Sequence, residues 1–250
     1  MEVRTMINAD IFKSDKINQL TEFRIRLIVR YVISCYLQML SENKKYSYSE
    51  RGKIPQEDFL SDKLVNDYLR KPKNTSHFKN NISDNQSVHI IFNNGENMIY
   101  SDITTNENRK DEIDIAVWES GLHSIWSDIV DNEVKFAIEC KRIENLSDAK
   151  EYVGDINKFC DRPFYCYKNR LPFEGQIAFI ENKDITHTTL YKKINDILET
   201  HKTISTIGFL NPIVLSDKFD GTYLSKHKRK NNRNFSIYHL LFNYSDVIVD

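Results

Sequence analysis

A change in residue pattern near position 87 constrains the fold of this 250-residue chain more than any other feature. Before it, residues 15–41 and 56–70 carry apolar side chains at helical spacing. After it come short runs of β-branched or aromatic residues, bounded by Asn, Asp and Gly and interrupted by helical patterns at 147–160 and 187–201. This mixture predicts an α/β protein with a mixed central sheet flanked by helices.

The predicted strands share a short length and a high content of β-branched or aromatic residues: 87–92, 97–103, 113–118, 134–142, 175–181, 206–210, 222–227 and 235–244. Residues 43–55 and 71–86 are polar and predict connections. In the first helix, apolar positions nearly encircle the segment from Leu27 onward, which predicts burial on both sides, as a core helix or as a dimer contact. We therefore expect an N-terminal helical extension over residues 1–50, packed on a larger α/β domain over residues 51–250.

Composition excludes several classes of protein. Thirty-five basic and 36 acidic residues leave a net charge of −1, so any nucleic acid must be bound by a local patch. The four cysteines lack the spacing of a disulfide scaffold or a zinc site. Residues 25–40 form the most apolar long stretch, which is too short to cross a bilayer, and no secretory signal opens the chain. We expect a soluble, cytoplasmic protein without a membrane partner. The cysteines are Cys35, Cys140, Cys160 and Cys166.

Charged residues stand inside two of the apolar strands. Glu139 and Lys141 are two positions apart in the strand at 134–142, so their side chains share one face. Asp114 is the lone carboxylate within the strand at 113–118. If the two strands are neighbours, Asp114 and Glu139 converge, with Lys141 beside them.

Such a group of charges predicts a metal-dependent chemistry. Two carboxylates held close together raise a pKa unless a cation neutralises them. Oxygen ligands without His or Cys suit Mg²⁺, for which Mn²⁺ can substitute. Asp114, Glu139 and the backbone carbonyl of Cys140 would hold the metal, which polarises a phosphodiester and activates a water, while Lys141 would orient that water or stabilise negative charge. The alternative is a structural Glu139–Lys141 ion pair beside an incidental Asp114.

Asp114 followed by Glu139-Cys140-Lys141 resembles the PD-(D/E)xK nuclease superfamily of restriction endonuclease-like proteins. The resemblance extends over residues 57–244 and includes the segment at 149–159, which is similar to the helix after this motif in a branch of bacterial nuclease-like proteins. It also includes the tail around 223–229. It implies a nuclease core with a four-stranded central sheet between helices. It further implies Mg²⁺-dependent hydrolysis of DNA, often in prokaryotic, antiviral defence against foreign DNA.

The chain departs from the superfamily's pattern at two points. Ile113 stands where the proline of the first motif precedes Asp114. Many members also carry an extra acidic residue on the helix before the first strand. Glu57, Asp62 and Glu22 are candidates for that metal ligand, and the sequence does not choose among them.

The predicted strand near the C-terminus has a row of residues suited to nucleic acid. In a strand at 222–229, an aromatic ring, a hydroxyl, an imidazole and a guanidinium share one face and can contact phosphates or stack on bases, with lysines alternating on the other face. Lys150, one turn into the helix at 147–160, is either a further phosphate contact or a surface lysine. The alternative for the strand is a solvated edge protected by its lysines. The row consists of Tyr223, Ser225, His227 and Arg229.

The sequence favours a Mg²⁺-dependent endonuclease that hydrolyses phosphodiester bonds of DNA. One alternative is a non-catalytic module on the same fold that binds nucleic acid or a protein. Another is an RNA-cleaving toxin or abortive-infection effector. The metal site acts on the phosphodiester, which DNA and RNA share, and not on the sugar. Possible partners are a second copy of the chain, since two sites cut two strands most easily, or a protein of a defence system.

Overall fold

The structure, a computed structural model, describes residues 9–71, 89–101, 108–120, 134–161, 172–230 and 232–249. Within these ranges, seven strands form one mixed sheet in the order β1-β2-β3-β4-β7-β6-β5. Strand β4 pairs in parallel with both β3 and β7, and the other pairings are antiparallel. The predicted α/β class with a mixed sheet is confirmed. The strands are β1 (His89–Ser101), β2 (Asn108–Ser120), β3 (Val134–Ile143), β4 (Phe173–Ile180), β5 (Ser205–Pro212), β6 (Thr222–Lys228) and β7 (Asn234–Asn243).

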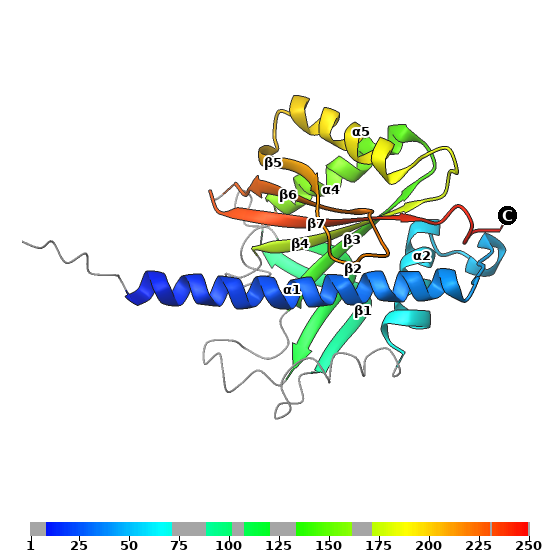
Figure 1. Ribbon diagram of the computed structural model, residues 1–250, viewed down its shortest axis with the longest axis horizontal. Helices are drawn as coiled ribbons and strands as arrows, with labels where there is room; N and C mark the ends of the chain where they lie inside the picture. The colour runs from blue at the N-terminus through cyan, green and yellow to red at the C-terminus, as the bar shows by residue number, and fades with distance from the viewer. Residues whose placement is uncertain are drawn as a thin grey trace, which may run out of the picture.

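Helices cover both faces of the sheet. Figure 1 shows α4 and α5 on one side of the sheet and the long α1 running along the other, with α2 near the C-terminus of the chain. The N-terminal helix and the flanking helices therefore agree with the predicted architecture. The bounds are α1 (Ala9–Ser41), η1 (Tyr48–Arg51), α2 (Gln56–Leu64), η2 (Val65–Leu69), η3 (Leu146–Asp148), α4 (Ala149–Asp161) and α5 (His187–Thr200).

The side chains of β3 show how the two layers are separated. Phe136, Ile138 and Cys140 belong to the hydrophobic core on the α1 side of the sheet. Ile143 belongs to the core on the side of α4 and α5. Because side chains alternate along a strand, Glu139 shares the α4 side with Ile143, opposite Phe136 and Ile138, as the sequence predicts.

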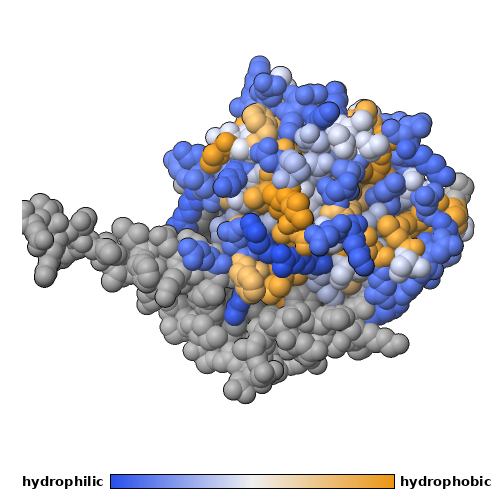
Figure 2. Space-filling model, viewed as in Figure 1, coloured by the Kyte–Doolittle hydropathy of each residue, from blue (hydrophilic) through white to orange (hydrophobic). Residues whose placement is uncertain are grey.

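Helix α1 is part of the main core, although it is not buried all round. Val32 and Met39 are buried, and the Tyr36 ring stacks on Phe242 of β7 with centroids 4.0 Å apart. Leu40, by contrast, is 40% exposed, and Phe23 is 57% exposed. In the single chain one wide face of α1 packs on the sheet and the other is exposed. A core helix buried on both sides within the chain is therefore not observed, and burial of the exposed face in a dimer stays a prediction. On the face shown in Figure 2, apolar residues form separate patches among hydrophilic ones.

Two further details differ from the expectations. The described residues of the predicted strands at 87–92 and 97–103 belong to one strand, β1, in which Gly95 adopts a left-handed φ of 64°. Across the described residues the sheet has seven strands, more than the four-stranded core that the resemblance implies. Cys166 and most of the connection predicted at 71–86 lie outside the described residues. Within the described part of the chain, no helix is long and apolar enough to cross a membrane.

Candidate functional site

The site lies where β2 and β3 separate. The two strands are neighbours, and their pairing ends at Ile115 opposite Ile138. Just beyond this pair, the backbone N–H of Cys140 on β3 donates to Asp114 Oδ2 on β2 at 2.6 Å. The Asp114 carboxylate thus bonds to the backbone of β3 at the point where backbone pairing between β2 and β3 has ended. The antiparallel register carries Asp114 toward Glu139, as the sequence reasoning required.

Negative charge accumulates at this point. Glu139 is buried, with 4% of its surface exposed. Burial raises the pKa of Asp114 well above its ordinary value, and the nearby charges of Glu139, Glu57 and Asp155 raise it further, against the hydrogen bond from Cys140. Carboxylates grouped in this way require a cation for all of them to be ionised together.

Lys141 supplies one positive charge to the group. Its Nζ lies 2.8 Å from Glu57 Oε1 and 3.5 Å from Asp155 Oδ2. Burial lowers the pKa of Lys141, but the charges of Asp155, Glu57 and Asp114 outweigh burial and hold it above the ordinary value. Lys141 is therefore a fixed, protonated cation between α2 and α4.

Of the three acidic candidates, the structure brings Glu57 to the site. One carboxylate oxygen of Glu57 accepts from Lys141, and the other accepts from the backbone N–H of Arg142 at 3.0 Å. Asp62 is bonded to asparagine side chains, and Glu22 pairs with a neighbour on α1. Only Glu57 among the three contacts the predicted catalytic residues.

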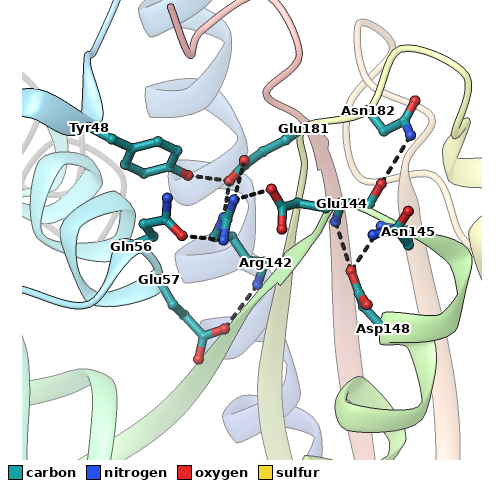
Figure 3. A network of polar contacts seen from close by, with 9 residues as sticks. All are labelled: Tyr48, Gln56, Glu57, Arg142, Glu144, Asn145, Asp148, Glu181 and Asn182. Carbon is teal, nitrogen blue, oxygen red and sulfur yellow. Dashed lines mark hydrogen bonds and ion pairs between the residues drawn. The ribbon is translucent and has the colours of Figure 1, made fainter. Parts of the chain in front are cut away.

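A network around Arg142 holds Glu57 in this position (Figure 3). The guanidinium donates to Glu181 at 2.7 and 3.0 Å and to Gln56 Oε1 at 2.5 Å, and it pairs with Glu144. The hydroxyl of Tyr48 donates to the same Glu181. Because Gln56 precedes Glu57 on α2, these contacts tie the start of α2 to the ends of β3 and β4. The carboxylate of Glu57 is thereby fixed beside Lys141.

The donor set suits a hard divalent cation. Glu57, Asp114 and Glu139 offer carboxylate oxygens, and the carbonyl of Cys140 points to the same side of β3 as its N–H, toward Asp114. Across the described ranges, no group of three or more His, Cys, Asp or Glu side chains is arranged to hold a metal ion. As placed, oxygens of Glu57 and Asp114 accept from Lys141 and from backbone N–H groups. The chemistry of these residues fits Mg²⁺, and binding would exchange those donors for the ion.

Sequence reasoning missed two members of the cluster, both on α4. Asp155 is only 3% exposed and lies between two lysines. Lys158, one helical turn further on, places its Nζ 2.6 Å from Asp155 Oδ1. An acid and a lysine three residues apart are the available signal, but this spacing also occurs on ordinary solvent-exposed helix faces.

The predicted nucleic-acid row on β6 lies inside the protein. The four side chains do share one face, but that face packs against α4 and α5 and all four are buried. Ser225 Oγ contacts Nε2 of His227 and of His239, each at 2.7 Å. Burial lowers the pKa of His227 to about 4, so its ring is neutral at pH 7.

The other two members of the row are also bonded internally. Arg229 donates to Glu174 Oε1 at 2.7 Å and to the Phe159 carbonyl at 2.5 Å. The Tyr223 hydroxyl shares a hydrogen bond with His187. The expectation that these four side chains contact phosphates and bases is therefore not met by their placement, because the helices cover them. The row consists of Tyr223, Ser225, His227 and Arg229.

The lysines predicted on the opposite face of this strand are placed as expected. Lys226 and Lys230 are exposed and Lys228 is partly so. Lys150 of α4 is exposed as well, and its contact with a phosphate stays a prediction.

No protein-family model, curated protein or solved structure matches this chain. The candidate site is therefore interpreted from its own chemistry.

Proposed function

We propose that the protein is a Mg²⁺-dependent nuclease that hydrolyses phosphodiester bonds of DNA. One observation carries the proposal: Asp114 and the buried Glu139 meet where β2 and β3 separate, beside a protonated lysine held by two helices. In a metal-dependent phosphodiester site, carboxylates of this kind hold the ion and a neighbouring cation stabilises negative charge on the phosphate. The setting of prokaryotic defence and a defence partner rest on the sequence resemblance, and the second copy rests on the argument that two sites cut two strands most easily.

The residues take different roles in this proposal. Asp114, Glu139 and the Cys140 carbonyl would hold the metal, with Glu57 as a further ligand. Bound Mg²⁺ supplies a Lewis acid that polarises the phosphodiester and lowers the pKa of a water. Lys141, kept protonated by its acidic neighbours, stabilises negative charge as it builds on the phosphate.

A second candidate function has its own support. The two contacts of Lys141, to Glu57 and Asp155, also suit a structural ion-pair network. In that case the chain would be a binding module for nucleic acid or protein, without catalysis. A nuclease acting on RNA would use the same site chemistry, so the polymer is decided by experiment.

The test is cleavage of plasmid, linear duplex, single-stranded DNA and RNA, each with Mg²⁺, with Mn²⁺ and with EDTA. We expect metal-dependent cleavage that falls by about a hundredfold or more in Glu139→Gln, because a charge that acts on the transition state is removed. Glu199→Gln, at an exposed position of α5, is the matched control and should cleave like the wild type. Wild-type protein that cleaves none of these polymers, or Glu139→Gln with full activity, would reject the proposal.

A further inference from the structure

Helix α4 brings a second charged pair to the edge of the site. The carboxylate of Asp155 lies between two lysines, with Oδ2 3.5 Å from Lys141 Nζ and Oδ1 2.6 Å from Lys158 Nζ. Oδ2 is buried and has no hydrogen-bond partner within the described structure. Leaving a buried carboxylate oxygen without a hydrogen-bond donor is costly, and the charge of Lys141, 3.5 Å away, offsets part of that cost.

The two lysines lie at different depths. The side chain of Lys141 is 17% exposed, whereas that of Lys158 is 58% exposed. Burial lowers the pKa of Lys158, but the bond to Asp155 and the charges of Asp155 and Glu139 outweigh it and raise the pKa above the ordinary value. Lys158 is thus a protonated cation at the solvent side, within electrostatic reach of Glu139.

We propose that Lys158 binds a backbone phosphate of the nucleic acid, and that Asp155 is a positioning residue for both lysines. This inference rests on the proposed function and adds to it the element that contacts the substrate. The row on β6 is buried and cannot make such contacts as placed, whereas Lys158 is exposed and oriented by an ion pair at (i, i+3). The carboxylate of Asp155 then sets the distance between Lys141, which is largely buried, and Lys158, which is exposed.

The experiment measures equilibrium binding of labelled duplex DNA, single-stranded DNA and RNA by fluorescence anisotropy, in EDTA and over a series of salt concentrations. Lys158→Gln should weaken binding by about tenfold. For the duplex, the slope of log K against log salt should fall by about 0.9, the value for one lost phosphate contact. Lys158→Arg keeps the charge and should restore both. Lys192→Gln, at an exposed lysine of α5, is the control and should bind like the wild type.

The role of Asp155 is tested by a double-mutant cycle. If Asp155 acts through Lys158, Asp155→Asn should weaken binding in the wild-type background and cost little more in the Lys158→Gln background. A merely structural role would give additive losses. Circular dichroism confirms that each variant is folded.

The outcomes separate this inference from the proposed function. Wild-type protein that binds one of the polymers, and Lys158→Gln that binds it more weakly, support the inference even where no cleavage is seen. Lys158→Gln with wild-type affinity and salt slope overturns it, even if the protein is a nuclease. Wild-type protein that binds none of the three polymers also overturns it.

Discussion

Asp114 shows that grouping buried carboxylates at one site lowers the stability of the folded protein. Its raised pKa, caused first by burial and then by Glu139, means that the folded protein favours the protonated carboxyl. Stability from such a group is fully present below the pKa of the unfolded chain, about 3.9, and is lost as the pH rises through the folded pKa. At neutral or alkaline pH without metal, Asp114 therefore destabilises the fold, because its carboxyl ionises more readily in the unfolded chain than in the folded protein.

Asp114→Asn should consequently stabilise the metal-free protein. We expect the thermal midpoint in EDTA at pH 8 to rise by about 2–4 °C, the shift that about 1 kcal/mol produces in a chain of this length. The gain should shrink as the pH falls toward 4 and vanish below it, where the wild-type carboxyl is protonated in both the folded and the unfolded state. Scanning fluorimetry at several pH values measures it, with Asp184→Asn at an exposed loop position as control. A lower midpoint than the wild type at pH 8 would contradict this account.

At the residue scale, the sequence identified the three charges that lie within the strands. Asp114, Glu139 and Lys141 were recognisable because a charge inside an apolar strand is unusual. Asp155 and Lys158 were not, because an amphipathic helix has charges on its solvent face in any case. Their role depends on how α4 packs on β3, which is a property of the assembled layers.

Strand β6 shows what alternation can and cannot predict at the scale of an element. The two-residue period of a strand correctly predicted that Tyr223, Ser225 and His227 share one face and that the lysines lie on the opposite face. It could not show which face is covered, because polar side chains can be buried when they bond to one another. Here Ser225, His227 and His239 satisfy each other beneath α4 and α5.

This buried network makes stability depend on pH. A histidine whose pKa falls to about 4 in the folded state stabilises the fold above its unfolded pKa of about 6.5, and that contribution is lost as the pH falls toward 4. We expect His227 to account for a loss of about 2 kcal/mol in the free energy of unfolding between pH 7 and pH 5. Urea unfolding at the two pH values measures it. His227→Gln should show a loss smaller by about that amount, whereas His201→Gln, at a partly exposed position, should behave like the wild type. Equal losses in wild type and His227→Gln would disprove the role of His227.

At the scale of the whole molecule, contacts link α1 and the residues just after it to β7 and the C-terminal segment. Tyr36 of α1 stacks on β7 and donates to the carbonyl of Asn243. Just after α1, the backbone of Tyr46 exchanges hydrogen bonds with Val247 and Val249. The N-terminal part therefore packs into the same core as the sheet.

Removing residues 1–45 should therefore unfold the protein. Each large buried side chain lost costs about 2–5 kcal/mol, and α1 contributes several, against a total stability of about 5–15 kcal/mol for a typical domain. We expect the truncated chain to lack a cooperative thermal transition by circular dichroism. Leu40→Ala, at an exposed position of the same helix, should keep that transition. A truncated chain that melts cooperatively and keeps the oligomeric state of the full chain would show that α1 is dispensable.

The sequence by itself determined the order of helices and strands and the shared face of Glu139 and Lys141. These properties depend on hydrophobic periods of 2 and 3.6 residues, which are local to each segment. It also indicated that Asp114 would meet Glu139, once the two strands were assumed to be neighbours.

Only the tertiary structure decided the rest of the site. It selected Glu57 over Asp62, placed Asp155 and Lys158 beside Lys141, and covered the row on β6 with helices. Each of these outcomes depends on contacts between elements far apart in the chain, such as α2 with β3 or α4 with β6. The spacing of apolar residues within one segment does not predict these contacts, because they form only when the layers pack against one another.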